Sequence, residues 1–422
     1  MNQKGNYKIN GVLNDFRSHH KQMRIFAYEK YRKSRDIISI AYSVFKLEQI
    51  NRKNKLRNVE IGRFVDEHYG ELEDILTELI SYVLLEKINI DFYNSKNKFY
   101  QKKLKEKNNL KTDAIVLFSG GIDSLAGIHW AKEYFNHITG VFCAHADQAW
   151  TIHTVNELSS ILFNKYNIEI KTIHVPEMQK GGYSQLRGFL YILAAGAWLD
   201  IYNTDTIVLS ECGPTIYQPR FGPYDSVTMT THPVVVEAAK SVLEIILKRK
   251  INIYTPFENM TKSEVISYIP NDVNISNTHS CITSRFGTHD GTCYGCVIRK
   301  LGTIGTNRID TNYNKNPLID DTANMDNLLS LLMYSQDILL DYDSMPLYQI
   351  EKIESYNKQD LFRRFALDNF AAIYLMNKKG IKPTSVVQQL YNDYINICGE
   401  SDLENRVRKL KDTNYLINEK IL

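Results

Sequence analysis

The feature that most constrains the fold is an apolar run from Ala114 to Phe118 that leads directly into the segment SGGIDS, residues 119–124. A short, continuous apolar run is typical of a strand buried on both faces of a parallel sheet. Apolar residues at helical spacing follow the glycines, at Leu125, Ile128, Trp130 and Phe135. The sequence therefore predicts a buried strand that turns through two glycines into a helix.

This strand–turn–helix arrangement favours the binding of anions. Glycines let a phosphate approach the backbone, and the free N–H groups and dipole at a helix N-terminus attract negative charge. Ser119 and Ser124 add hydroxyl donors, and Asp123 adds a carboxylate that can hold a metal or position a water. The segment has neither the G-x-x-x-x-G-K-[ST] pattern nor the G-x-G-x-x-G pattern of two familiar phosphate loops.

The segment instead resembles SGGxDS, the pyrophosphate loop of the N-type ATP pyrophosphatases. In that superfamily the loop grips the β- and γ-phosphates while a substrate oxygen attacks the α-phosphate, which yields an adenylated substrate and pyrophosphate. A match at all five specified positions of this motif, directly after an apolar strand, argues against the alternative of a glycine-rich turn that only packs. The resemblance implies nucleotide binding by Phe118, Ser119, Gly120, Gly121, Asp123 and Ser124.

Beyond this motif, strand patterns alternate with helical patterns. Strands are expected at 138–145, 169–175, 206–210 and 251–256, with helices at 152–165, 184–200 and 233–249 and a further helix opened by Thr261. Such alternation predicts an α/β fold, a doubly wound parallel sheet flanked by helices.

The regions on either side of this core have different patterns. Residues 1–110 contain strand patterns at 58–65 and 90–93 around an amphipathic helix at 70–87, which indicates a small α+β unit. Residues 318–422 have helical patterns. We therefore expect an N-terminal extension for partner binding (1–110), a nucleotide-binding core with a metal site (111–310) and a helical C-terminal extension (311–422).

Charge is distributed unevenly along the chain. The first 110 residues contain 22 Lys and Arg against 14 Asp and Glu, whereas the remainder contains 29 against 34. A basic segment favours contact with nucleic acid or an acidic protein, and a solvated helical face is the alternative. The start has no apolar leader and no apolar run has membrane-spanning length, so we expect a cytoplasmic protein that does not bind a membrane.

Three of the six cysteines, Cys281, Cys293 and Cys296, cluster late in the chain. A C-x-x-C pair with a third cysteine upstream has the spacing of a tetrahedral zinc site, whereas buried free thiols are the alternative. The fourth ligand is open between His289, Asp290 and His279, and we favour His289 because imidazole is the commoner partner of thiolates. Four protein ligands would leave zinc no open position, so such a site would fasten a loop over the active site.

The loop and the cysteine cluster together resemble the QueC family, the 7-cyano-7-deazaguanine synthases. The family's zinc-binding segment reads S-C…C-x-x-C-x-x-C-x-L-R, and Ser280, Cys281, Cys293, Cys296 and Arg299 match it, while its second cysteine falls on Asp290. Further matches lie within 113–305, at Asp147-Gln148 with His153 and Glu157, at Arg187, at Thr255-Pro256, and at Thr261-Lys262-Ser263-Glu264.

Members of this family convert 7-carboxy-7-deazaguanine into the nitrile with ATP and ammonia. The resemblance implies ATP, Mg²⁺ and Zn²⁺, with Asp123 on the metal–phosphate side. Arg187 and Lys262 become catalytic candidates as cationic phosphate clamps, and surface or capping roles are the alternative for both. Tyr183, Phe221 and Tyr224 are candidates to stack on the flat nucleobase, although aromatic residues more often pack in a core.

The extensions before and after the core make this chain similar to the longer QueC-like proteins of bacterial anti-phage islands, including Qat and CBASS-type operons. That resemblance implies transfer of the activated deazaguanine carboxylate to an amine of a partner protein from the same operon. Ammonia capture remains open, as does a catalytically inactive nucleotide sensor. Modification of tRNA is not favoured, because no separate RNA-binding motif accompanies the basic segment.

Overall fold

A computed structural model describes residues 7–9, 25–26, 28–54, 56–63, 70–94, 111–145, 149–175, 185–217, 231–283, 288–341 and 358–412. At its centre lies a five-stranded sheet with the strand order β6-β5-β4-β7-β8, and every neighbouring pair is parallel. The strands are β4 (Ala114–Leu117), β5 (Ile138–His145), β6 (Glu169–Val175), β7 (Thr206–Val208) and β8 (Asn252–Tyr254). The expectation of a doubly wound parallel sheet is confirmed.

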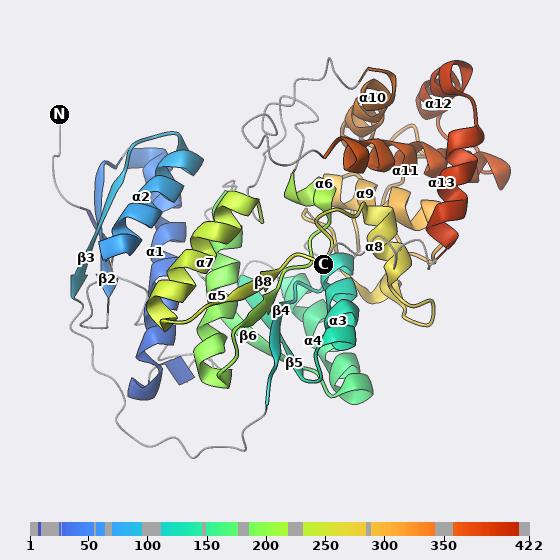
Figure 1. Ribbon diagram of the computed structural model, residues 1–422. Coiled ribbons are helices and arrows are strands. Elements are labelled where there is room, and N and C mark those ends of the chain that lie inside the picture. The colour runs from blue at the N-terminus through green and yellow to red at the C-terminus, as the bar shows by residue number, and fades with distance from the viewer. Residues whose placement is uncertain are drawn as a thin grey trace.

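Helices cover both faces of this sheet (Figure 1). The face with α3 (Ile122–Tyr134), α4 (Ala149–Tyr166) and α8 (Lys262–Tyr268) forms one apolar core. The face with α5 (Arg187–Tyr202) and α7 (Pro233–Leu247) forms another. Strand β4 serves both cores, since Ala114 and Val116 point to the first and Ile115 to the second. Side chains alternate between the faces of a strand, and this explains why its sequence is apolar throughout.

A second, three-stranded sheet lies in the N-terminal region. Strands β1 (Tyr7–Ile9), β2 (Asn58–Arg63) and β3 (Asn89–Asn94) are parallel in the order β1-β2-β3, with helices α1 (Arg32–Asn54) and α2 (Gly70–Leu84) between them in sequence. The three elements predicted from residues 58–93 are present. Their parallel, alternating arrangement is of the α/β kind, which differs from the expected α+β unit because each helix makes a crossover between parallel strands.

The N-terminal unit shares its apolar core with the central domain. One continuous cluster of buried residues includes side chains of α1, α2, β2, α5 and α7, and α1 packs against α5. A polar contact accompanies this packing: the Glu48 carboxylate of α1 accepts hydrogen bonds from the backbone N–H groups of Gln185 (2.7 Å) and Leu186 (3.1 Å). The first 110 residues are therefore fastened to the N-terminus of α5, where Arg187 lies.

The C-terminal region is helical, as expected. It contains α10 (Asp326–Leu340), α11 (Gln359–Lys378), α12 (Ser385–Cys398) and α13 (Ser401–Lys411), which share a core with α9 (Tyr294–Gly305). A short helix, α6 (Gly213–Ile216), packs against α11 through Ile216, Tyr217 and Phe362. Among the helices of the described ranges, none is long and apolar enough to cross a membrane.

Replacement of Glu48 by alanine tests the contact between the N-terminal unit and α5. Glu48 is fully buried, so Glu48→Ala leaves two backbone donors without their acceptor and should cost about 1–3 kcal/mol in free energy of unfolding. Urea-induced unfolding measures this loss. Lys46→Ala, on an exposed position of the same helix, should change stability by less than about 0.5 kcal/mol. Equal effects of the two variants would contradict a specific role of the Glu48 carboxylate.

Candidate functional site

The candidate site lies where strands β4 and β7 end. Counted within the central sheet, the strand order is 3-2-1-4-5, so the chain leaves β4 and β7 in opposite directions across the sheet. Open α/β sheets bind their ligands at such a switch point, outside the carboxyl ends of the strands. The SGGIDS segment follows β4, and Ser210-Glu211 follows β7.

The turn after β4 has the shape required of a phosphate loop. Gly120 adopts a left-handed backbone conformation (φ +79°), and a Cβ at this position would come within 2.8 Å of the Val155 side chain. Gly121 is the N-cap of α3, and no side chain of the described residues caps the helix there. The Ser124 hydroxyl donates to Gly121 O (2.9 Å) and lies 3.3 Å from the Ser119 hydroxyl. The N-terminus of α3 is thus open to an anion.

The structure brings two of the predicted catalytic residues into direct contact. Lys262, the first residue of α8, places its ammonium 2.6 Å and 2.5 Å from the two oxygens of Asp123 in the first turn of α3. Both side chains are 15% exposed. Burial alone would lower the pKa of Lys262, but the Asp123 carboxylate and neighbouring groups outweigh it and raise that pKa. Lys262 is therefore a permanently charged cation beside the phosphate loop.

Arg187, the third predicted catalytic residue, begins α5 on the other side of the switch point. Its guanidinium carbon lies 6.0 Å from the centre of the Tyr191 ring, and its buried Nε has no hydrogen-bond partner among the described residues. The Tyr191 hydroxyl in turn lies 2.8 Å from Nε2 of His145, at the carboxyl end of β5. The charges of Arg187 and Lys262 both act on Glu211. Two cations are thus available to an anionic ligand.

The sequence interpretation missed Glu211. This residue follows β7, is partly exposed and accepts a hydrogen bond from the Thr231 hydroxyl. Burial and the charge of Asp123 raise the pKa of Glu211, against the opposing influence of Thr231, Arg187 and Lys262. The available signal was an acidic residue directly after a buried strand, a position at which catalytic groups of parallel sheets gather.

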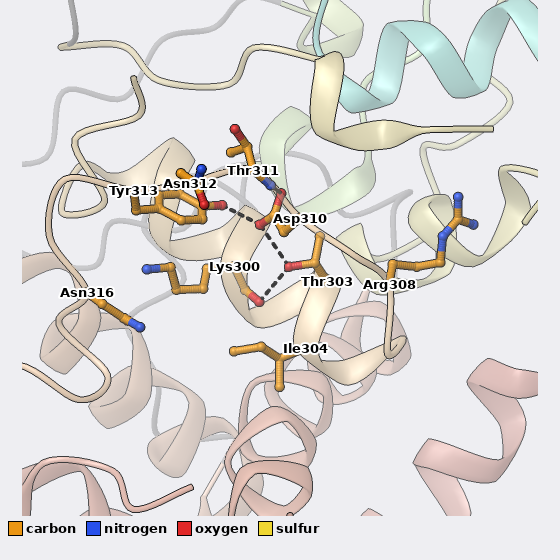
Figure 2. A pocket seen from close by; sticks show the side chains of 9 residues that line it. All are labelled: Lys300, Thr303, Ile304, Arg308, Asp310, Thr311, Asn312, Tyr313 and Asn316. Atoms are coloured by element: carbon orange, nitrogen blue, oxygen red, sulfur yellow. Dashed lines mark hydrogen bonds between the residues drawn. The ribbon is translucent and has the colours of Figure 1, made fainter. Parts of the chain in front are cut away.

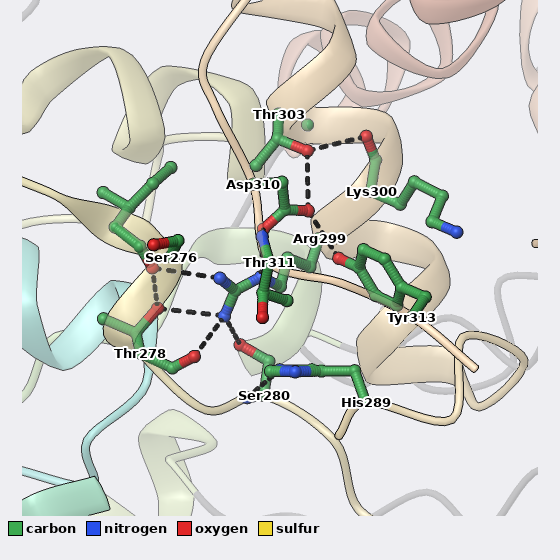
Figure 3. Close-up of polar contacts among 12 residues, drawn as sticks. Ser276, Thr278, Ser280, His289, Arg299, Lys300, Thr303, Asp310, Thr311 and Tyr313 are labelled. Carbon is green, nitrogen blue, oxygen red and sulfur yellow. Dashed lines mark hydrogen bonds and ion pairs between the residues drawn. The ribbon is translucent and has the colours of Figure 1, made fainter. Parts of the chain in front are cut away.

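The cysteine segment packs against the phosphate loop. The His279 N–H donates to Gly120 O (2.9 Å), so the backbone just before Cys281 lies beside the SGGIDS turn. Arg299, which is 1% exposed, holds this backbone through bonds to Thr278 O (2.8 Å) and Ile275 O (3.0 Å), and it pairs with Asp310 (2.8 Å). Figure 3 shows the guanidinium between Thr278, Ser280 and Asp310. Arg299 therefore fixes the backbone segment that packs against the SGGIDS turn.

Four side chains converge in this segment. The Sγ atoms of Cys281, Cys293 and Cys296 and a carboxylate oxygen of Asp290 all lie within 4.8 Å of one another. Zinc–sulfur bonds of about 2.3 Å in a tetrahedron would place two sulfurs about 3.8 Å apart, and Cys281 and Cys293 are 3.9 Å apart. Three thiolates and a carboxylate are a donor set suited to zinc. These residues fit a structural zinc ion.

Asp290, and not the favoured His289, is the fourth member of this group. Nε2 of His289 instead accepts a hydrogen bond from the Ser280 N–H (3.1 Å), and its ring packs against Tyr313. Asp290 Oδ1 accepts from the backbone N–H groups of Thr292 and Cys293, which turns the carboxylate toward the thiols. The geometry corrects our preference. Adjacent residues point in different directions, and spacing alone could not decide which one faces the cysteines.

A neighbouring lysine is consistent with a negatively charged centre. Lys300 is 6% exposed, its ammonium has no hydrogen-bond partner within the described ranges, and it lies 3.8 Å from the centre of the Tyr313 ring. Burial lowers the pKa of Lys300 to about 8, while Asp310 and Cys296 act in the opposite direction. Figure 2 shows Lys300, Thr303 and Asp310 along a polar pocket of about 330 Å³ beside α9. The Asp310 carboxylate is the first charge that offsets the burial of this cation, and Cys296 is the second.

Other residues that the sequence singled out lie partly outside the described ranges and partly on α4 and at the start of α8. Asp147, Gln148, Tyr183, Phe221 and Tyr224 lie outside the described residues. His153 and Glu157 form an exposed pair on α4, 3.6 Å apart. The helix expected to open at Thr261 does so: the Thr261 hydroxyl accepts from Glu264 N, and Glu264 accepts from Thr261 N. This capping box orients the first turn of α8, and with it Lys262.

The fold and the site define an α/β protein with a candidate phosphate loop at the switch point of a parallel sheet and a candidate metal centre beside it. Residues 229–306 match the family model described as "Queuosine biosynthesis protein QueC". The matching segment contains Lys262 and all four candidate zinc ligands, and through it the chain is similar to the QueC family. This match supports a QueC-like, ATP-using function related to deazaguanines. A search of curated proteins found no match.

The identity of the fourth zinc ligand can be tested by metal content. Asp290→Ala removes the only non-sulfur member of the group and should lower the zinc retained per chain after dialysis against a chelator. His289→Ala should retain zinc as the unmodified protein does, since its imidazole is engaged by Ser280 N. Elemental analysis of both purified variants measures the outcome. Loss of zinc from His289→Ala with retention in Asp290→Ala would contradict the assignment.

Proposed function

We propose that this protein adenylates the carboxylate of 7-carboxy-7-deazaguanine with ATP and transfers the activated acyl group to an amine, the N-terminus of a partner protein in anti-phage defence. The observation that supports adenylation is the phosphate loop at the switch point, with the Lys262 ammonium beside Asp123. The family match supports a deazaguanine substrate. The extensions on both sides of the core support a protein partner in place of a free small amine.

In the first step a carboxylate oxygen of the substrate attacks the α-phosphorus of ATP. The bond between the α-phosphorus and the bridging oxygen breaks, and pyrophosphate leaves with the electron pair. A carboxylate is a poor electrophile, and this step turns its oxygen into part of a leaving group. The open N-terminus of α3 binds phosphate oxygens, and Lys262 and Arg187 offset the charge that develops on them.

In the second step the amine nitrogen attacks the acyl carbon, AMP leaves, and an amide forms. The attacking amine must lose a proton, and Glu211 is placed to accept it at the end of β7. A base is effective when its pKa lies close to the working pH, and the raised pKa of Glu211 moves it in that direction. Asp123, already paired with Lys262, has the different task of orienting that cation.

The acidic residues near the loop bear on the expectation of Mg²⁺. In the described part of the chain, the only group of three or more metal-binding side chains is the cysteine group, so Asp123 and Glu211 form no cage of their own. Magnesium is commonly bound by one or two carboxylates together with substrate phosphates. We propose that Mg²⁺ arrives with ATP and that Asp123 lies on the metal side of the phosphates, while Glu211 remains available as the base of the second step.

Two other functions remain as alternatives. Nitrile formation with ammonia would begin with the same adenylation step. Ammonia would then give a primary amide, whose oxygen must be activated by a second ATP and leave with AMP to form the nitrile. A nucleotide sensor without turnover would need the loop but not Glu211 or a charged Lys262. The pairing of Lys262 with Asp123 and the raised pKa of Glu211 favour an enzyme, since both features prepare groups for chemistry.

Pyrophosphate release and the mass of a co-expressed partner protein test the proposal. With ATP and 7-carboxy-7-deazaguanine, the enzyme should release pyrophosphate and add one deazaguanine acyl group to the partner. Asp123→Ala frees Lys262 from its partner and should slow pyrophosphate release roughly 100-fold or more. Glu133→Gln, at the exposed end of α3, is the control and should keep full activity. Nitrile formed with ammonia alone would favour the synthase, and no pyrophosphate under either condition would favour the sensor.

The role of Glu211 predicts a particular pH dependence. Protonation removes the base, so the rate of amide formation should fall as the pH drops through the raised pKa of Glu211, at higher pH than for an ordinary glutamate. Glu211→Gln should lower the rate of amide formation roughly 100-fold or more and remove this acidic limb. Single-turnover measurements from preformed adenylate isolate the step. An unchanged acidic limb in the variant would assign it to another group.

A further inference from the structure

The C-terminal extension contacts the residues on either side of Lys262. Arg406 of α13 donates to Asp368 Oδ1 (2.6 Å) and to Glu264 Oε1 (2.7 Å), and Arg364 of α11 donates to both oxygens of Glu264. Asp368 accepts from the Thr261 hydroxyl. Thr261 and Glu264 form the capping box of α8, so the extension holds the first turn of that helix on two sides. We call Glu264, Arg364, Asp368 and Arg406 the buried clamp.

Three of the four members of the buried clamp are almost completely closed to solvent, and the Arg364 side chain is 13% exposed. Glu264 is 1%, Asp368 2% and Arg406 3% exposed, and Thr261, which they contact, is 0% exposed. Its two carboxylates and two guanidinium groups balance in charge. The charges of Arg406 and Arg364 outweigh burial and lower the pKa of Glu264, whereas burial outweighs the charge of Arg406 and raises the pKa of Asp368. The clamp is therefore a buried, hydrogen-bonded group of charged residues, and it contacts Thr261 and Glu264, which flank Lys262 and Ser263.

Stability alone is a poor explanation for such a group. The cost of removing four charges from water offsets most of their attraction, and apolar residues of similar volume often replace a buried ion pair without loss of stability. Apolar contacts also dock the C-terminal helices on the core, since Phe362 of α11 packs against Ile216 of α6 and Tyr217. The ionic contacts add a defined orientation of α8, because hydrogen bonds to Thr261 and Glu264 fix the rotation and position of the N-terminus of this helix.

We propose that Arg406 and Asp368 are positioning residues for the adenylation step, which act through Thr261 and Glu264 to place the Lys262 ammonium against Asp123 and the phosphate loop. This inference rests on the proposed function. It also assigns a task to the C-terminal extension, since all of the clamp except Glu264 lies beyond residues 229–306, the segment that matches the family model. A displacement of about 1 Å at a catalytic group can cost roughly 100-fold in rate.

The test compares variants of the full chain in pyrophosphate release. Arg406→Met/Asp368→Leu removes one positive and one negative charge and keeps apolar volume, so that no unpaired charge is left between the two positions. Its kcat should fall roughly 10- to 100-fold, with the KM for ATP nearly unchanged. Arg406→Lys retains the charge and should recover part of the rate. Arg408→Met, at an exposed position of the same helix, should behave as the unmodified enzyme.

A second control separates positioning from simple docking of the extension. Phe362→Leu weakens the apolar contact with Ile216 and Tyr217 without touching the clamp. At a temperature where this variant and the double variant are equally folded by circular dichroism, only the double variant should lose kcat. Equal losses in both variants would show that the clamp acts only through docking, and the proposal would be wrong.

A readout without turnover tests the same point independently of the proposed function. The Lys262 ammonium is 15% exposed and paired, so a limiting amount of an amine-acylating reagent should label it slowly in the unmodified protein. In the double variant its labelling should rise several-fold relative to the exposed Lys411, as measured by peptide mass spectrometry. Unchanged labelling would overturn the positioning role. Absence of pyrophosphate release from the unmodified enzyme would instead contradict the proposed function, while the labelling result would still decide the role of the clamp.

Discussion

One ion pair joins the N-terminal turns of two helices, α3 and α8. The ammonium of Lys262, at the start of α8, contacts both carboxylate oxygens of Asp123, at the start of α3. The pair brings a cation to the open N-terminus of α3, where backbone N–H groups already favour an anion. Other parts of the structure act on this arrangement. The phosphate loop needs Gly120 in its left-handed conformation, and Lys262 needs a fixed first turn of α8.

Each region of the chain supports one side of the site. The N-terminal unit binds the backbone before Arg187 through Glu48, and the C-terminal helices bind the backbone around Lys262 through the buried clamp. The cysteine segment lies against the phosphate loop through the bond from His279 N to Gly120 O. A zinc ion held by Cys281, Asp290, Cys293 and Cys296 would stiffen that segment, a structural use of the metal that agrees with four protein ligands.

Local patterns were enough to predict much of this fold. Apolar runs located the strands of the central sheet, and the two glycines after β4 located the phosphate loop, because both depend on residues adjacent in sequence. The parallel pairing of the N-terminal strands was missed, since a strand pattern does not state its partner's direction. Glu211 was missed for a related reason: an acidic residue after a strand gains significance only when that strand is known to lie next to β4.

The sequence by itself determined the sheet strands, the helices around them, the glycine turn between β4 and α3, and the presence of a thiol-rich group. Only the tertiary structure decided that Asp290 joins the thiols while His289 turns away, that Lys262 faces Asp123 across 139 positions of the chain, and that Arg406 reaches the cap of α8. The physical reason is the separation along the chain between the residues that decide each feature. Secondary structure follows from the chemistry of near neighbours, whereas ligand sets and ion pairs depend on directions that are fixed when distant segments pack together.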